Sequence, residues 1–310
     1  MRSKSVVNDE TFQFDYEKPF GTLILAGGQG SRLGFDLPKG CFELAPDVSL
    51  FSLLISKSKR NNGLIAIMTS EQNDRATKDY FEHHAYFGIE RERIDFFIQE
   101  SEQVVDEENQ LVFQKEGVVL KAPAGNGSCF HAFYQSGLLD KWKKRNVFAI
   151  NVIPIDNLLA NPIDPHLLGA IDQGYEIAIR GIQKEKEEKI GLLVSENEIL
   201  KVLEYFELKT HFETLGYSGL FAMSLSFFEK VCHERLPWHI AQKKAVVWKN
   251  EKLEEITVYK KEKFIFDVFP KAKKFIILNT CRKKYFCPLK DKEGPFGIAA
   301  VREMYKKVNI

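Results

Sequence analysis

The residues with the clearest potential for chemistry lie in a glycine-rich stretch near the N-terminus. It reads Leu25-Ala-Gly-Gly-Gln-Gly-Ser-Arg-Leu-Gly34 and is followed by Pro38-Lys39-Gly40. Glycines that follow a strand allow backbone N–H groups to approach a phosphate closely. Arg32 and Lys39 add two cations to the same stretch. The stretch is therefore a candidate for holding a triphosphate between backbone amides and two positive side chains.

Two common phosphate-binding loops do not fit this stretch. The dinucleotide fingerprint G-x-G-x-x-G, started at Gly28 and Gly30, requires a third glycine where the chain has Leu33. The Walker loop requires a lysine after its last glycine and then a Ser or Thr. Here Lys39 precedes Gly40, and no Ser or Thr follows it. The first mismatch argues against a nicotinamide-dependent oxidoreductase, and the second argues against a Walker loop. A loop that holds a triphosphate in another way remains the preferred interpretation.

A single carboxylate follows the most apolar run of the chain. Val147–Ile155 predicts a buried parallel strand, and Asp156 comes directly after it. Ligands of open parallel sheets bind beyond the carboxyl ends of the strands. Asp156 is therefore a candidate for contact with a ligand, although an Asp at a strand end is also a common turn former.

The glycine-rich stretch resembles the signature of nucleotide-sugar pyrophosphorylases, L-x-G-G-x-G-T-R-L-G-x-x-x-P-K-G, with Ser31 in place of the Thr. The resemblance is greatest to the UDP-N-acetylhexosamine pyrophosphorylases and covers about residues 21–290. Further matching stretches follow in the order of that family: Ile67–Ser70, Tyr86–Gly88, Phe96–Gln99, Pro123–Gly127, Val152–Asn157, Asp164–Pro165, Val202–Tyr205, His239–Lys244 and Lys260–Asp267.

This resemblance implies a fold and a reaction. The fold is α/β, the Rossmann-like fold of nucleotide-diphospho-sugar transferases, with a mixed, mainly parallel sheet and helices on both faces. The reaction joins UTP and a sugar 1-phosphate into a UDP-sugar and pyrophosphate. N-acetylglucosamine 1-phosphate is the foremost acceptor, with relaxed selectivity. One alternative is a UTP–glucose-1-phosphate uridylyltransferase, and another is a non-catalytic nucleotide-sugar sensor on the same fold.

The resemblance also implies a uridine site made of Ala26, Gly27, Gly28, Gln99 and Gly125. The residue types suit this role. A glutamine amide offers one donor and one acceptor, which is enough to read a uracil edge, and glycine lets the base lie against the backbone.

The hexose site implied by the resemblance contains Asn126 and Glu204, whose side chains can hydrogen-bond sugar hydroxyls. The family places an Asn near the N-acetyl group. Gly216–Leu220 is the best match to that region, so Leu220 stands where the family has the Asn. A leucine cannot hydrogen-bond an amide carbonyl, which predicts weaker selectivity for the N-acetylated sugar.

The remaining implied roles concern charge. Asp156 corresponds to a residue that binds Mg²⁺, the one cofactor expected, between the nucleotide and sugar phosphates. Arg32 and Lys39 would hold the leaving pyrophosphate. Lys260 corresponds to a lysine that reaches the phosphates, with Lys261 and Lys263 as close rivals. Arg32, Lys39 and Lys260 are therefore the predicted catalytic residues, and their presence argues against a sensor.

These residues must be positioned by alternating strands and helices. Short apolar runs predict strands at Thr22–Ala26, Leu64–Met68, Ile94–Ile98 and Phe275–Leu278. Helical patterns occupy the stretches between and after them: a helix capped by Ser49 and starting at Leu50, then Gln72–Phe87, Gly127–Lys144, Leu225–Cys232, Glu262–Lys271 and Ile298–Lys307. Such alternation is typical of a parallel sheet covered by helices on both faces.

Composition limits the alternatives. The chain has 310 residues, with 44 Lys+Arg and 43 Asp+Glu, so the basic excess of a nucleic-acid binder is missing. No apolar run approaches the ~20 residues that span a bilayer, and the first 18 residues have no signal-peptide core. Five cysteines without metal-site spacing fit reduced thiols. We therefore expect a cytoplasmic protein without nucleic-acid or membrane partners; its oligomeric state is not predicted.

The expected organisation has three parts. Residues 1–18 form an N-terminal arm, residues 19–285 form the uridylyltransferase catalytic domain, and residues 286–310 form a short helical extension. No linker of low complexity and no internal repeat separates them.

Overall fold

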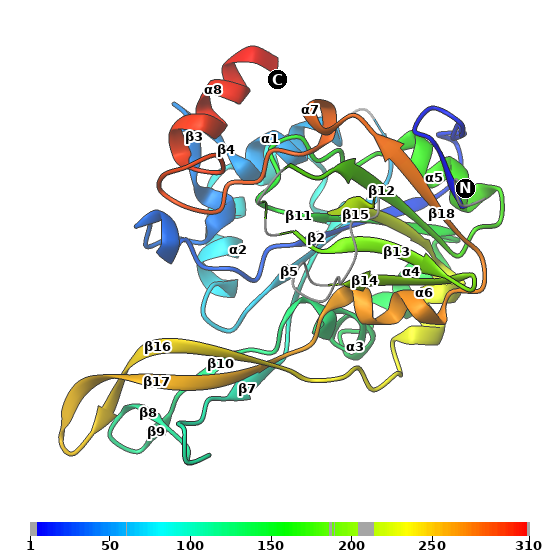
Figure 1. Cartoon of the computed structure of the whole chain (residues 1–310). Helices are drawn as coiled ribbons and strands as arrows, with labels where there is room; N and C mark the ends of the chain where they lie inside the picture. The colour runs from blue at the N-terminus through cyan, green and yellow to red at the C-terminus, as the bar shows by residue number, and fades with distance from the viewer. Residues whose placement is uncertain (1–4, 60, 186–187, 189, 204–213, 309–310) are drawn as a thin grey trace.

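The apolar runs of the sequence form the middle of a ten-stranded sheet (Figure 1). The computed structural model describes residues 5–59, 61–185, 188, 190–203 and 214–308. In spatial order the sheet contains β1 (Val6–Asn8), β18 (Phe275–Thr280), β12 (Ile177–Gln183), β15 (Leu215–Ser224), β11 (Ala149–Pro154), β2 (Phe20–Leu25), β5 (Leu64–Thr69) and β6 (Ile94–Ile98), with β13 (Leu192–Glu196) paired to β15 and β14 (Ile199–Leu203) paired to β13.

Smaller elements surround this sheet. The short sheets contain β3 (Glu43–Ala45) with β4 (Val48–Ser49), β7 (Ser101–Gln103) with β10 (Lys121–Pro123), and β8 (Phe113–Lys115) and β9 (Val118–Val119) with β16 (His239–Lys249) and β17 (Lys252–Glu262). The α-helices are α1 (Leu50–Lys57), α2 (Asp74–His83), α3 (Cys129–Gln135), α4 (Leu138–Lys144), α5 (Pro165–Asp172), α6 (Leu225–Val231), α7 (Arg282–Tyr285) and α8 (Ile298–Val308). The 3₁₀ turns are η1 (Ser31–Leu33), η2 (Lys39–Cys41), η3 (Ala85–Gly88), η4 (Arg91–Arg93), η5 (Asn126–Ser128) and η6 (Ile265–Lys271).

The main sheet is mixed and mainly parallel, as predicted. Strands β11, β2, β5 and β6 run parallel to one another, and so do β1, β18 and β12. Only β15 reverses direction on this path, between β11 and β12. The carboxyl ends of β2, β5, β6 and β11 therefore lie along one edge, where an open α/β sheet binds its ligands.

Helices cover both faces of the sheet, because successive strand residues point to opposite sides. Leu23, Ile150 and Val152 contribute to a core with α3, α4 and α6. Ile24 and Ile153 face the other way and contribute to a core with α1, α2 and α8. Helix α5 packs beside them in a third cluster. Figure 1 shows these two helical layers above and below the sheet.

Most predicted helices form where their end signals lie. Ser49 caps α1 in a reciprocal pair, since its Oγ accepts from the N–H of Ser52 at 3.0 Å and the Ser52 Oγ accepts from the N–H of Ser49 at 2.8 Å. Two predictions are wrong. The stretch 127–144 forms two helices, α3 and α4, because Gly137 adopts φ +78° and breaks the helix. Residue Glu262 ends strand β17, and only Ile265–Lys271 forms a helical turn, with Pro270 inside it.

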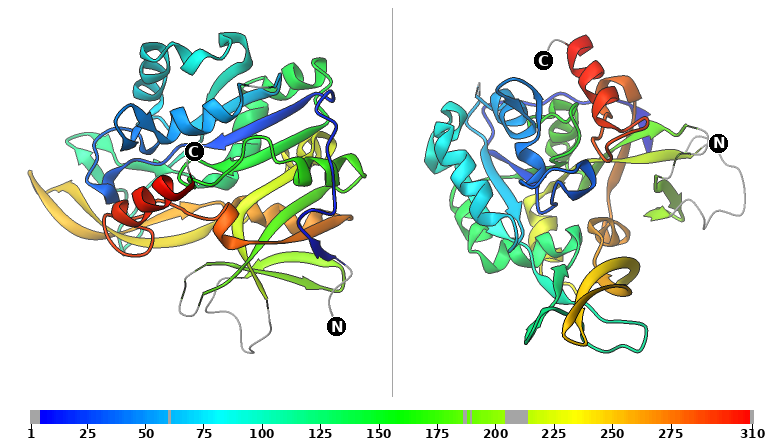
Figure 2. Two further views of the ribbon diagram at one scale, coloured as in Figure 1. Left: turned by 90° about the horizontal axis from the view of Figure 1, so that it is seen from above. Right: turned by 90° about the vertical axis from the view of Figure 1, so that its left-hand side faces the viewer.

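A long hairpin, β16 with β17, projects from the body of the molecule (Figures 1 and 2). A small apolar cluster joins the hairpin to the segment between β7 and β8; the cluster contains Val104, Val112, Val247 and Val258. The carboxyl end of β17 returns to the body and leads directly into η6. The hairpin thus brings residues 262–264 close to the loop that begins at Gly125.

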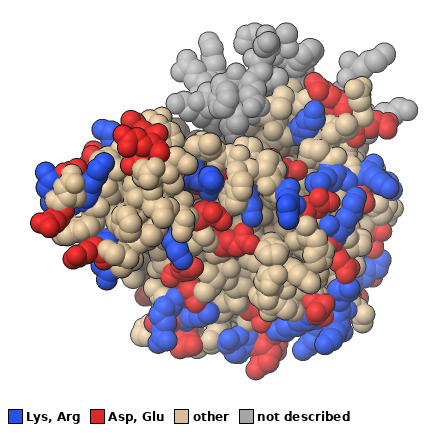
Figure 3. Space-filling model, turned by 90° about the horizontal axis from the view of Figure 1, so that it is seen from below, with Lys and Arg blue, Asp and Glu red and all other residues tan. Residues whose placement is uncertain are grey.

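Both chain ends contribute to the same fold as the predicted catalytic domain. Strand β1, within the predicted arm, pairs with β18 in the main sheet. Helix α8, within the predicted extension, buries Val301 in the core beneath α1 and α2. In the described part of the chain no helix is long and apolar enough to cross a membrane. Lysine and arginine are interspersed with aspartate and glutamate over the face drawn in Figure 3.

Candidate active site

The glycine-rich stretch leaves β2 at the ligand-binding edge of the sheet. The N–H of Ala26 donates to the carbonyl of Met68 at 2.9 Å, which extends the β2–β5 pairing by one residue. Asn73, 1% exposed, donates from Nδ2 to the carbonyls of Ala26 at 2.9 Å and Gly28 at 3.2 Å. Because one buried amide holds two carbonyls of the loop, the loop has a fixed shape, and a phosphate-binding loop requires such a shape.

Gly27 and Gln99 meet at the end of β2 and β6. A Cβ on Gly27 would lie 1.8 Å from the Gln99 Nε2, so the glutamine side chain occupies the space that a larger residue would fill. Gln99 is 4% exposed, and none of the hydrogen bonds found among the described residues uses its side-chain amide. Its donor and its acceptor can therefore pair with a base edge. The structure thus brings together two of the predicted uridine residues.

The loop that begins at Gly125 is held by the segment after the hairpin. Gly125 adopts φ +89°, and a Cβ there would lie 2.4 Å from the carbonyl oxygen of Lys263. The N–H of Lys263 donates to Ala124 at 2.7 Å, and the N–H of Gly127 donates back to Lys263 at 2.9 Å. The Asn126 Oδ1 accepts from the N–H of Ile265 at 2.9 Å, so the Asn126 amide nitrogen remains as the donor available to a ligand.

Asp156 lies just beyond β11, as predicted, and meets the glycine-rich stretch. Its Oδ2 is 3.5 Å from the Nζ of Lys39, and the two side chains are 24% and 16% exposed. Lys39 also donates to the carbonyl of Leu289 at 3.2 Å. The structure therefore joins three distant segments of the chain around one carboxylate and one ammonium group.

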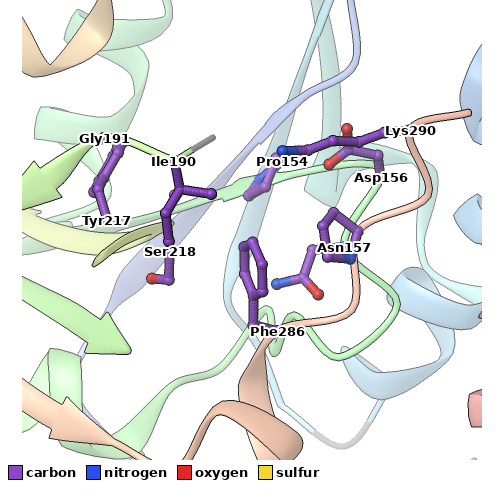
Figure 4. A pocket seen from close by; sticks show the side chains of 11 residues that line it. Pro154, Asp156, Asn157, Ile190, Gly191, Tyr217, Ser218, Phe286 and Lys290 are labelled. Atoms are coloured by element: carbon purple, nitrogen blue, oxygen red, sulfur yellow. The ribbon is translucent and has the colours of Figure 1, made fainter. Parts of the chain in front are cut away.

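A cavity of about 260 Å³ opens beside Asp156 (Figure 4). Residues from β11, β15 and the two segments 190–191 and 286–290 line it: Pro154, Asp156, Asn157, Ile190, Gly191, Tyr217, Ser218, Gly219, Phe286, Pro288 and Lys290. In Figure 4, Lys290 and Asp156 lie side by side at one end, while Ile190 and Ser218 lie on the opposite wall. The cavity thus combines an apolar body with a carboxylate and an ammonium, a combination typical of small-ligand sites.

Two further groups near the cavity have shifted pKa values because of burial. Burial raises the pKa of Tyr217, whose ring packs against Phe221, Phe266 and Phe269. Burial lowers the pKa of Lys57 from its ordinary 10.5 to about 8. Lys57 donates to the carbonyls of Leu158 at 3.3 Å and Ala160 at 3.0 Å, so it supports the loop that follows Asp156.

Other predicted site residues lie apart from the cavity lining. Lys260 is on β17 and forms an ion pair with Glu262, and none of Lys260, Lys261 and Lys263 lines the cavity. Arg32, in η1, is exposed and makes no ion pair within the described chain. Leu220 is 2% exposed and packs in the core with α1 and α2, while the preceding Gly219 lines the cavity. Glu204 lies outside the described residues.

Lys290 is the site residue that sequence reasoning missed. It falls in the predicted extension, where nothing in its spacing distinguishes it from neighbouring lysines. Its position depends on contacts across the chain, such as the bond between the N–H of Cys287 and the Oδ1 of Asn157, 130 residues apart. A second lysine of this segment, Lys292, lies against Gly34, where a Cβ would be 2.5 Å from its Nζ.

The donor set around Asp156 fits a magnesium ion that is shared with phosphates. The described residues contain no group of three His, Cys, Asp or Glu side chains that could form an all-protein metal site. Mg²⁺ is usually bound by one or two carboxylates together with substrate phosphates and water. A single accessible carboxylate at the cavity end is consistent with that mode of binding.

Comparison with known proteins agrees with this geometry. The family model described as UTP–glucose-1-phosphate uridylyltransferase matches residues 5–298. The UDP-N-acetylglucosamine pyrophosphorylase of Saccharomyces cerevisiae is 32% identical over 308 residues, which cover 88% of this chain and 64% of the yeast protein. A protein of Encephalitozoon cuniculi named "Probable UDP-N-acetylglucosamine pyrophosphorylase" is 35% identical, and the match covers 89% of this chain and 82% of that protein.

Solved structures show the same arrangement of elements. The UDP-N-acetylglucosamine pyrophosphorylase of Trypanosoma brucei, solved with an inhibitor, superposes with a TM-score of 0.84 at 28% identity. The match covers 93% of this chain and 65% of that one. The chain thus spans less than two thirds of the yeast and trypanosomal proteins.

Proposed function

Because the chain belongs to the UTP–glucose-1-phosphate uridylyltransferase family, we propose that it transfers the uridylyl group of UTP to a hexose 1-phosphate and releases pyrophosphate. The foremost acceptor is N-acetylglucosamine 1-phosphate, since the yeast and trypanosomal relatives are UDP-N-acetylglucosamine pyrophosphorylases. The products are the UDP-sugar and pyrophosphate, and the reaction is reversible.

One observation carries the proposal: Asp156 pairs with Lys39 of the glycine-rich stretch and lies beside Lys290 at one end of the cavity. A protein that only sensed a nucleotide sugar would have no need for cations that neutralise a leaving group. The cavity provides room for a sugar, and the cations at its end suit a phosphate.

The reaction needs no nucleophile from the protein. An oxygen of the sugar phosphate forms a bond with the α-phosphorus of UTP, and the bond from that phosphorus to the bridging oxygen of the β-phosphate breaks. The electron pair leaves with pyrophosphate. Positioning of the two substrates and neutralisation of charge account for the catalysis of such in-line transfers.

The charged side chains have separate roles in this transfer. Lys39 and Arg32 bind the leaving pyrophosphate, and the planar guanidinium of Arg32 suits two phosphate oxygens at once. Lys290 faces the cavity and binds the phosphate of the incoming sugar, the role that the sequence had suggested for Lys260. Asp156 would hold Mg²⁺, which supplies positive charge between the two phosphates when it is bound.

Separate residues contact the uridine and the sugar. Gln99 and Gly27 contact the uracil, with Ala26, Gly28 and Gly125 along the nucleoside. The position of the Gln99 amide directly beside Gly27 supports this assignment. Asn126 and Glu204 bind sugar hydroxyls.

The experiment that tests the function is a pyrophosphate-release assay of the purified chain. UTP is offered with N-acetylglucosamine 1-phosphate, N-acetylgalactosamine 1-phosphate and glucose 1-phosphate, each with and without Mg²⁺. We expect release with a hexosamine phosphate, and release that depends on Mg²⁺. No release with any sugar would contradict the proposal, and binding of UDP-sugar without release would favour a sensor.

A further inference from the structure

One buried asparagine joins the segment that carries Asp156 to the segment that carries Lys290. Asn157 is 1% exposed and uses both ends of its amide. Its Nδ2 donates to the carbonyl of Tyr285 at 2.7 Å, and its Oδ1 accepts from the N–H of Cys287 at 2.9 Å. The Oδ1 also accepts from the N–H of Leu159 at 3.2 Å. A single side chain therefore bonds three backbone groups in two segments.

Backbone hydrogen bonds continue this junction on both sides. The N–H of Leu158 donates to Cys287 at 3.1 Å, and the N–H of Leu289 donates to the carbonyl of Asp156 at 2.8 Å. The bond from Leu289 places the backbone of Lys290 next to the strand end. Residues 156–158 and 287–289 are thus joined by a short ladder of backbone hydrogen bonds.

Tyr285, which precedes the ladder, is held by a buried arginine in the core. Arg180 is fully buried, pairs with Asp164 through two contacts of 2.5 and 2.7 Å, and lies 3.7 Å above the ring of Tyr285. The carbonyl of Tyr285 is the acceptor that Asn157 uses. The segment that leads to Lys290 is therefore fixed at Tyr285 by Arg180 and at Cys287 by Asn157.

We propose that Asn157 is a positioning residue for the uridylyl transfer, because its amide holds the carboxylate of Asp156 and the ammonium of Lys290 against the same cavity. This inference rests on the function proposed above. Without the amide, the segment 285–290 keeps two backbone bonds to the strand end and loses the two that Asn157 makes to Tyr285 and Cys287. Lys290 would then bind the sugar phosphate in more than one position, and only one of these positions is productive.

Strand β11 contains a matched control. Asn151 is also fully buried, and its Nδ2 donates to the carbonyls of Asn161 at 2.8 Å and Pro162 at 3.0 Å. It therefore joins the same strand to a different loop, and neither of these two acceptor residues lines the cavity. Asn151→Ala removes comparable buried hydrogen bonds, so it reports the general cost of losing such an amide.

The test is a double-mutant cycle in the pyrophosphate-release assay with Asn157→Ala, Lys290→Ala and the double variant. We expect Asn157→Ala to lower kcat at least thirtyfold with KM for UTP within threefold, and Asn151→Ala to leave kcat within twofold. If Asn157 acts through Lys290, the double variant is no more than twofold slower than Lys290→Ala alone. Multiplied losses, or a normal kcat for Asn157→Ala, would overturn the proposal.

Two further measurements keep the proposal testable. If Asn157→Ala does not fold, Asn157→Asp keeps the acceptors for Cys287 and Leu159 and removes only the donor to Tyr285; the same non-additivity with Lys290→Ala is expected. Hydrogen exchange of the amides of Cys287 and Leu289 needs no turnover. It should accelerate at least tenfold in the Asn157 variant and stay within twofold in Asn151→Ala; equal exchange would refute the positioning role even if the chain proved to have another function.

Discussion

The ammonium of Lys39 lies 3.5 Å from the carboxylate of Asp156, so the glycine-rich stretch and the end of β11 meet through one ion pair. Lys39 also donates to the carbonyl of Leu289, which precedes the cavity lysine Lys290. A divalent cation bound to Asp156 would compete with Lys39 for this carboxylate. We therefore expect Lys39 to turn toward the phosphates when nucleotide and cation bind together.

Replacing Asp156 tests the metal role. Asp156→Ala should lower Mg²⁺-dependent kcat more than a hundredfold, since loss of a group that stabilises transition-state charge typically costs ~3 kcal/mol or more. The control is Asp95→Ala, which removes a carboxylate of similar exposure that pairs with Lys141 at 2.7 Å away from the cavity. The assay is a Mg²⁺ titration of pyrophosphate release. Near-normal turnover of Asp156→Ala at saturating Mg²⁺ would show that the metal is held elsewhere.

Arg32 and Lys39 should affect kcat more than substrate binding. Both are assigned to charge that grows on the leaving pyrophosphate, and such groups act mainly in the transition state. Arg32→Ala and Lys39→Ala are each expected to lower kcat at least tenfold while KM for the sugar phosphate changes less than threefold. Steady-state kinetics with both substrates varied distinguishes these effects. An increase in KM for the sugar phosphate at unchanged kcat would place the two side chains at the acceptor instead.

Adjacent glycines of the loop should respond differently to the same substitution. A Cβ on Gly27 would lie 1.8 Å from the Gln99 Nε2, whereas a Cβ on Gly28 would meet nothing within 4 Å. Gly27→Ala should displace Gln99, destabilise the fold by about 1–3 kcal/mol and weaken UTP binding at least tenfold. Gly28→Ala should leave the midpoint of thermal unfolding nearly unchanged. Calorimetry of unfolding and of UTP binding measures both effects; equal behaviour of the two variants would contradict the assigned contact.

Local signals in the sequence predicted part of this site, and long-range contacts determine the rest. The glycine-rich stretch and Asp156 could be identified because each follows an apolar run that forms a strand. Lys290 could not, because its place at the cavity depends on bonds to residues 156–158 that no local pattern reveals. Lys260, the lysine that the resemblance implies for the phosphates, lies on β17 and pairs with Glu262, and its catalytic role stays a prediction.

Lys57 predicts a pH dependence of stability. Its pKa falls from 10.5 to about 8 on folding because burial disfavours the charged form. Between these two values the unfolded chain binds more protons than the folded chain, so this group makes the free energy of unfolding rise with pH, by at most about 1.4 kcal/mol per pH unit. Below pH 8 Lys57 is charged in both states and contributes no slope.

Lys57→Met isolates this contribution from other groups that titrate at high pH. The difference in unfolding free energy, wild type minus Lys57→Met, should increase from pH 8 to pH 10 and stay constant from pH 6 to pH 7. Urea unfolding at each pH provides the measurement. A constant difference across the whole range would show that Lys57 has an ordinary pKa in the folded protein.

The selectivity between sugar phosphates should depend on Leu220, which stands where the family has an Asn near the N-acetyl group. Its side chain is buried in the core, and the neighbouring Ser218 Oγ already donates to the carbonyl of Arg180 at 2.6 Å and accepts from the N–H of Leu220 at 3.2 Å. This part of the wall therefore offers no side-chain donor to an acetamido carbonyl. Losing one such bond is worth roughly 1–3 kcal/mol, or about five- to 150-fold in discrimination.

We therefore expect N-acetylglucosamine 1-phosphate to be preferred only modestly, with glucose 1-phosphate accepted as a real substrate. The measurement is kcat/KM for both sugar phosphates under one set of conditions. A preference of a thousandfold or more for the N-acetylated sugar would show that another group supplies the missing bond.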